Sequence, residues 1–149
     1  MRSERGFTLV EVLIVLTIVG ILLGVAIPRY GSVTGAMKVR SAKQEIASLL
    51  SQGRAMAIQT DQTVQVVRTA NVISLIAVRE SGSTIVAQQD LAFQFGVTVS
   101  ATKDTVAYDS RGMVTGNNVT LKYVVTNGVA RDSVCLLALG KVSPRGCAL

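Results

Sequence analysis

The sequence has no histidine and no tryptophan, and it has only two cysteines, two prolines, three phenylalanines and three tyrosines. Without histidine, Ser/His and Cys/His catalytic pairs and histidine-based metal sites are excluded. The sequence also contains no CxxC pair, no P-loop and no GxGxxG loop. We therefore expect a protein that is not an enzyme and has no cofactor.

Two carboxylates near a turn, Asp104 and Asp109, are the remaining candidates for a metal site. A carboxylate pair or a calcium loop uses such residues. Aspartates exposed to solvent in turns are the simpler interpretation, because Asp favours turns on its own account. We expect no metal here.

The most prominent positive feature is an apolar run near the N-terminus. The 21 residues from Phe7 to Ile27 carry one charge, Glu11, and follow a short leader with two arginines. A helix of that length spans a hydrocarbon core of about 30 Å. We predict a transmembrane helix over residues 7–27, and the basic leader places its N-terminus in the cytoplasm.

Glu11 needs an explanation, because a carboxylate at the centre of a membrane costs about 2.5–3.5 kcal/mol on insertion scales. A cut between Gly6 and Phe7 would free an α-amino group four residues before Glu11. That amine could pair with Glu11 of the same chain or of a neighbour. An ordinary secretory signal has a shorter apolar core and a small-residue exit. A plain single-pass anchor explains the length but not the glutamate.

The leader, Gly6, the segment 7–11 (FTLVE) and the apolar helix together resemble the class III signal of type IV pilins and type II secretion pseudopilins. The resemblance implies that a prepilin peptidase removes residues 1–6 and N-methylates Phe7. It also implies that Glu11 serves in assembly. Pro28 resembles the proline that ends the membrane segment in this family.

The helical pattern continues beyond the apolar run. Pro28 predicts a kink, because proline lacks an N–H and clashes with the preceding turn. Residues 28–60 then read as an amphipathic continuation, with an apolar stripe at Ile46, Leu49, Leu50, Gly53 and Ala57. The sequence predicts one long helix over about residues 7–59. The GxxxG at residues 20–24 permits close helix approach but also occurs by chance.

Residues 61–149 have the composition of strands and turns. Runs rich in β-branched residues predict strands at 63–68, 72–78, 85–95, 97–101, 105–108, 119–126 and 133–139. Turn residues separate them, and Asn127-Gly128 is the strongest hairpin signal. The predicted fold class is α+β, a long N-terminal helix packed on a small antiparallel β-sandwich.

Two segments make the resemblance more specific. Residues 51–64 (SQGRAMAIQTDQTV) and 107–112 (AYDSRG), with a closing strand that ends in Gly140-Lys141-Val142, resemble the GspH/FimT minor pilins. The implied partners are other pilins or pseudopilins, the prepilin peptidase, the inner-membrane assembly machinery and membrane lipid. The implied location is the bacterial inner membrane with the C-terminal domain periplasmic, and then a pilus or pseudopilus.

Three functions remain open at this point. The chain could be a minor pilin at or near the tip of a type IV pilus, a minor pseudopilin of a type II secretion system, or a pilus subunit that captures DNA.

Cys135 and Cys147 predict a disulfide, because an exported domain meets oxidising conditions. Closing the 11-residue loop between them would contribute about 3 kcal/mol in the chain-entropy model. Two free thiols are the alternative.

The same loop carries the residues that bear on DNA. Members of this family that take up DNA are expected to use a Gly-Arg-x-Arg motif, which 140–143 (GKVS) matches with Lys141 and loses at Ser143. Arg145 follows inside the loop, and Arg131 is expected nearby. These cations would bind phosphates without reading sequence. The alternative is a solvated basic loop with a structural role only.

Overall fold

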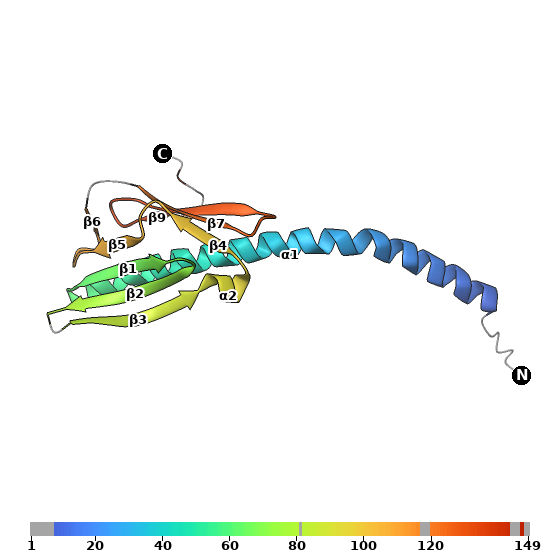
Figure 1. Ribbon diagram of the computed structural model, residues 1–149, viewed down its shortest axis with the longest axis horizontal. Coiled ribbons are helices and arrows are strands. Elements are labelled where there is room, and N and C mark those ends of the chain that lie inside the picture. The colour runs from blue at the N-terminus through green and yellow to red at the C-terminus, as the bar shows by residue number, and fades with distance from the viewer. Residues whose placement is uncertain (1–7, 81, 117–119, 144–146, 148–149) are drawn as a thin grey trace, which may run out of the picture. The chain divides into compact units, whose positions relative to one another are not determined.

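The computed structural model describes residues 8–80, 82–116, 120–143 and 147, and only the backbone of residues 25–30 and 32 (Figure 1). The chain divides into two compact units, residues 1–34 and 35–149. A single helix, α1 (Leu9–Thr60, 52 residues), contributes to both. Each unit is described by itself below.

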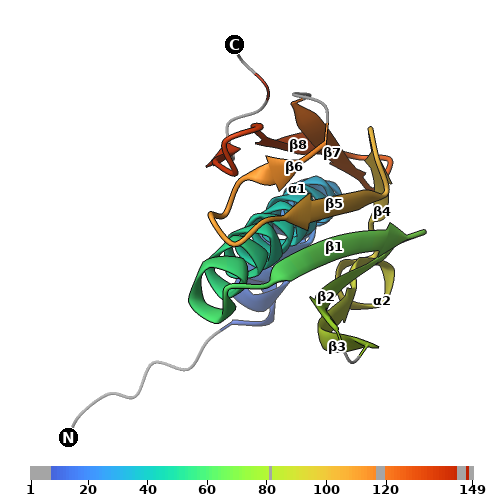
Figure 2. The same cartoon turned by 90° about the vertical axis from the view of Figure 1, so that its left-hand side faces the viewer.

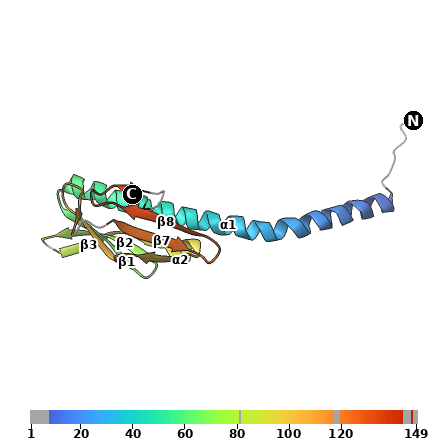
Figure 3. The same cartoon turned by 90° about the horizontal axis from the view of Figure 1, so that it is seen from above.

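Unit 35–149 contains two antiparallel sheets. The five-stranded sheet has the order β3-β2-β1-β5-β6, and the four-stranded sheet has the order β4-β7-β8-β9. Both lie against the second part of α1 (Figures 2 and 3). The strands are β1 (Thr63–Thr69), β2 (Val72–Arg79), β3 (Gly82–Asp90), β4 (Thr98–Ala101), β5 (Thr105–Tyr108), β6 (Val114–Thr115), β7 (Leu121–Thr126), β8 (Arg131–Leu136) and β9 (Val142–Ser143).

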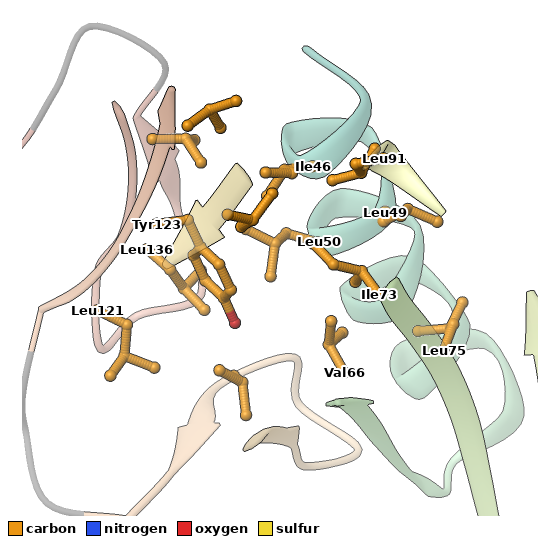
Figure 4. Close-up of a cluster of buried hydrophobic side chains, with 14 of the residues drawn as sticks. Ile46, Leu49, Leu50, Val66, Ile73, Leu75, Leu91, Leu121, Tyr123 and Leu136 are labelled. Atoms are coloured by element: carbon orange, nitrogen blue, oxygen red, sulfur yellow. The ribbon is translucent and has the colours of Figure 1, made fainter. Parts of the chain in front are cut away.

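The core lies between this part of α1 and the inner faces of the two sheets (Figure 4). Ile46 and Leu50 of α1 are fully buried, as are Ile73 of β2 and Leu136 of β8. Among the residues whose side chains the structure describes, the buried hydrophobic ones fall between Val39 and Leu136. The described core therefore lies within unit 35–149.

Gly53 explains how closely the helix approaches the sheet. A Cβ built at Gly53 would lie 2.9 Å from Leu75 Cδ1 and 3.1 Å from a Val66 methyl. A side chain there would crowd Leu75 and Val66, so glycine at this position of the predicted stripe lets α1 pack closely on β1 and β2.

The predicted fold class is confirmed, but one predicted strand is wrong. Residues 85–95 do not form one strand: β3 ends at Asp90, and a short helix, α2 (Leu91–Phe95), follows. The Asp90 carboxylate caps α2 by accepting the Phe93 N–H at 3.0 Å. Gly96 ends the helix in the left-handed conformation, with φ 63°. Capping at both ends overrides the strand propensity of the apolar residues.

The closing hairpin is as Asn127-Gly128 predicts. β7 pairs with β8 in antiparallel register, and the Asn127 side-chain oxygen accepts N–H groups from Val129 and Ala130 at 3.1 and 2.9 Å. β8 stops earlier than the predicted 139, because a turn closes where the Gly140 N–H donates to the Leu137 carbonyl at 2.8 Å. β6 and β9 were not predicted, since strands of two residues leave no periodic pattern.

Candidate functional site

The N-terminal unit begins with a capped helix. The Glu11 N–H donates to the Thr8 hydroxyl at 3.3 Å, so Thr8 caps α1. Glu11 stands at the third helical position, the acidic position of a capping box. A carboxylate in the first turn is also favoured by the positive end of the helix dipole. Gly6 and Phe7, the predicted cleavage and methylation residues, lie outside the described residues.

This geometry gives Glu11 a local role besides the predicted pairing with the Phe7 amine. A positive amine just before a helix N-terminus is unfavourable, and a first-turn carboxylate offsets it. Pairing of Glu11 with Phe7 stays a prediction.

The apolar half of α1 is exposed within its unit. Twelve large apolar side chains between Leu9 and Leu23 have relative exposures from 43% to 76%. The single hydroxyl near the middle of this stretch, on Thr17, donates back to the carbonyls of Leu13 and Ile14 at 2.7 and 2.9 Å. Such back-bonding satisfies a polar group where no water is present.

Glycine leaves one side of this segment free of side-chain bulk. A Cβ built at Gly20 or at Gly24 would meet no atom within 4 Å. The GxxxG pair is thus open to a partner helix, as the motif allows. The helix also runs through Pro28 without interruption, and a kink there stays a prediction. Over the described residues, no helical stretch combines the length and hydropathy that a membrane crossing requires.

The segments that carried the finer resemblance meet at Arg54 of α1. The turn around Gly112 joins β5 to β6, and the turn around Gly140 joins β8 to β9. Arg54 Nη1 donates to the Gly140 carbonyl at 3.3 Å. A Cβ on Gly140 would lie 2.2 Å from the Gly112 oxygen, so the two turns touch through their backbones. Both glycines have positive φ, 74° and 75°.

Asp109 builds the first of these turns. Its carboxylate accepts the N–H groups of Arg111 and Met113 at 3.0 and 2.8 Å. Asp104 instead forms an ion pair with Arg68. The two aspartates considered for a metal therefore have separate structural roles. The described residues contain no group of three carboxylate or cysteine ligands.

Tyr108 of β5 lies close enough to Arg54 and to Tyr123 of β7 for their charges to act on it. The hydroxyls of Tyr108 and Tyr123 and the Nε of Arg54 are buried without hydrogen-bond partners in the described part of the chain. Burial, and next the nearby Tyr123, raises the pKa of Tyr108 above its ordinary range. Burial also raises the pKa of Tyr123, to about 12. Both phenols are therefore neutral at physiological pH.

The predicted disulfide is present. Cys135 of β8 is fully buried and is joined to the exposed Cys147, with their Cα atoms 5.3 Å apart. The bridge ties the chain end beyond β9 to a central strand of the four-stranded sheet.

The predicted DNA-binding residues do not form one cluster. Lys141 follows the turn at the end of β8, where Leu136 pairs with Val142. Arg131 begins β8 at its other end, opposite Thr126. Five residues of strand separate the two ends by about 16 Å, so the expectation that Arg131 lies near Lys141 is wrong. Arg131 starts the extended strand β8, and Lys141 follows the turn beyond the strand's other end. Arg145 lies outside the described residues.

The charges on the four-stranded sheet and its loops that have no ion-pair partner among the described residues are all positive. Its two described acidic residues are both engaged: Asp132 pairs with Lys43 of α1, and Asp104 pairs with Arg68. Partial burial works against ionisation of Asp132, but hydrogen bonds from Lys43 and the Ser133 N–H outweigh it and lower the pKa. Four exposed cations form no ion pair with any described residue: Lys103, Lys122, Arg131 and Lys141.

This architecture, a helix with an exposed apolar half whose other half is wrapped by two small antiparallel sheets, defines a pilin-like protein of the minor pilin or pseudopilin class. Two family models match the sequence: the prokaryotic N-terminal methylation motif over residues 1–27, and the type II transport protein GspH over residues 42–140. The chain belongs to the GspH family.

Solved structures share the fold at low sequence identity. The type IV minor pilin FimU of Pseudomonas aeruginosa is 15% identical with a TM-score of 0.60, over 72% of this chain and 88% of that one. The minor pseudopilin EpsH of the Vibrio cholerae type 2 secretion system is 12% identical with a TM-score of 0.59, over 71% and 94%. Two fimbrial proteins of P. aeruginosa are 43% identical over 49 residues, 33% of this chain. That match spans about a third of their length, 32%.

Proposed function

We propose that this chain is a minor structural subunit of a type IV pilus, incorporated at or near the tip, and that it is not an enzyme. In this proposal a prepilin peptidase cuts between Gly6 and Phe7 and methylates the Phe7 amine. Residues 7–27 anchor the protein in the inner membrane as a single span, with unit 35–149 in the periplasm until assembly. Other pilins, the assembly machinery and lipid are its partners.

One observation carries this proposal. The apolar half of α1 exposes twelve large apolar side chains, and its helix start carries Glu11 three residues after the capping Thr8. An apolar surface of that extent needs lipid or other apolar helices to cover it. A filament core of packed helices supplies such a cover after the membrane has done so. The methylation motif at the same residues supports the same order of events.

Terminal mass spectrometry of protein purified from host membranes tests the processing step. We expect a chain that begins at Phe7 with one added methyl group. An intact Met1, or a start beyond Ala26, would contradict the proposal.

The alternative is a minor pseudopilin of a type II secretion system, which the GspH family match favours. The two proposals separate when the gene is deleted in its host and restored in trans. A pilus role predicts loss of pili with normal protein secretion. Loss of secretion with normal pili would support the alternative.

DNA binding is a second candidate function, because the exposed cations of the four-stranded sheet have no ion-pair partner among the described residues. Such cations bind phosphates by releasing counterions, so affinity should fall as salt rises. Titration with duplex DNA at low and moderate salt tests this. The Lys141→Ala, Arg145→Ala variant reports on the C-terminal loop, and Lys122→Ala, Arg131→Ala reports on the β7–β8 hairpin. Absence of binding even at low salt would leave the structural role alone.

A further inference from the structure

The five-stranded sheet ends in a long strand with a free edge. β3 has nine residues and pairs only with β2 in the described chain. The other strands that end a sheet are shorter: β4 has four residues, and β6 and β9 have two each. Natural proteins guard long edges with charge or proline, because the unpaired backbone groups invite another strand.

β3 has few of these protective residues. Its sequence, GSTIVAQQD, contains no Pro and no Lys, Arg or Glu, and its one charge, Asp90, caps α2. A register shift leaves Val86 without a partner on β2, between the pairs Ile85–Ile76 and Ala87–Leu75. Bulges often protect edges, but this one carries an apolar residue. Ile85 and Val86 are 59% and 47% exposed.

The order of residues along β3 is self-complementary. We propose that β3 pairs antiparallel with β3 of a second copy of this chain, centred on Val86. This register places Ile85 opposite Ala87 and the hydroxyls of Ser83 and Thr84 opposite the amides of Gln89 and Gln88. Gly82 then lies opposite Asp90. Apolar side chains meet at the centre, polar ones meet on both sides, and like charges do not oppose each other.

Charge favours a second copy over a polyanion as the occupant. The chain carries a net charge of +6, so two copies repel where their cations face each other. Apart from Asp90, which caps α2, β3 has no charge, and neither do the outward residues of β2 beside it (Ser74, Ile76 and Val78). Two copies can therefore approach here without that repulsion. A nucleic acid would find no cation on this strand. The exposed cations described above belong to the four-stranded sheet.

Cysteine cross-linking of the full chain in detergent tests both the contact and its register. Antiparallel partners lie about 4.5–5.5 Å apart at Cα, within the range of a disulfide. Both native cysteines are already bonded to each other. Under mild oxidation, Val86→Cys should form a covalent dimer well above the level of Ser100→Cys, a matched control on an exposed residue of β4.

Two further variants fix the register. A mixture of Ser83→Cys chains with Gln89→Cys chains should cross-link, whereas either variant alone should not, because each residue faces the other type. Val86→Lys should lower self-association by at least tenfold. Dimers of Val86→Cys no more abundant than those of Ser100→Cys would overturn the proposal, and so would dimers of Ser83→Cys alone. If the chains associate through the apolar helix alone, Val86→Cys should give no more dimer than Ser100→Cys.

Discussion

The contact between the two turns at Gly112 and Gly140 makes a sharp prediction about stability. Replacing Gly140 by Ala forces a Cβ into the left-handed region, which costs about 1–2 kcal/mol. The same Cβ would lie 2.2 Å from the Gly112 oxygen, and a backbone atom cannot rotate away. Overpacking costs about 1–3 kcal/mol. Gly140→Ala should therefore lower the free energy of unfolding by about 2–5 kcal/mol.

Two other glycines distinguish the cost of placing a Cβ at positive φ from the cost of its clash with neighbouring atoms. Gly128 has φ 82° but no atom within 4 Å of a built Cβ, so Gly128→Ala should cost only the conformational term, about 1–2 kcal/mol. At Gly112 the Cβ would lie 2.7 Å from Ile58 Cδ1, the end of a half-exposed side chain that can move. Gly112→Ala should lie between the other two.

Urea unfolding of unit 35–149, which contains the whole described core, measures all three variants. The expected order of destabilisation is Gly128→Ala, then Gly112→Ala, then Gly140→Ala. If Gly140→Ala is no worse than Gly128→Ala, the two turns are not in backbone contact and the reasoning fails. A change in the m-value would instead indicate loss of two-state behaviour.

Further predictions concern assembly, the disulfide and pH. Glu11→Ala should allow membrane insertion but lower filament incorporation, because it leaves the charge of the Phe7 amine uncompensated. Glu11→Gln keeps the shape of the side chain without its charge and should behave like Glu11→Ala. Normal incorporation of either variant would contradict the pairing. Reducing Cys135–Cys147 should lower the unfolding free energy by about 3 kcal/mol, and two thiols that alkylate without reductant in exported protein would argue against the bridge. The folded pKa of Tyr123 is raised to about 12 from 10.0, so its contribution to stability should be complete below pH 10 and lost as pH rises toward 12. Tyr123→Phe should remove that part of the alkaline loss, and an unchanged profile would show that Tyr123 does not titrate with unfolding.

The sequence predicted the elements with strong periodicity or strong local signals. The stripe at Ile46, Leu49 and Leu50 identified the face of α1 that is buried, because helical spacing determines which residues share a face. Asn127-Gly128 identified the β7–β8 hairpin. Boundaries were less well predicted where caps decide them, as at α2, which Asp90 caps at its start and Gly96 at its end.

The site was predicted in its residues but not in its arrangement. Segments 107–112 and 140–142 were singled out by resemblance, but their meeting at Arg54 depends on how two sheets fold over one helix. Sequence spacing does not contain that information. Arg131 was placed wrongly for a different reason: the extended strand β8 lies between Arg131 and Lys141 and holds them at opposite ends. The sequence shows where the cations are, but not which of them are unpaired. That required the ion pairs of Asp104 with Arg68 and of Asp132 with Lys43.

The β7–β8 turn has a mechanical consequence. The Asn127 side chain donates to the Gly35 carbonyl at 2.8 Å, and Asp132 of the same hairpin pairs with Lys43 two turns further along α1. Gly35 is the first residue of unit 35–149. Tension applied along α1 from its N-terminal side would therefore reach this hairpin first. It would load the hairpin in shear along β8. The disulfide is attached to the same strand, at Cys135. α1 is one continuous helix from the apolar half into the core. Within unit 35–149, the first event under force should be loss of the hydrogen bond between Asn127 and Gly35.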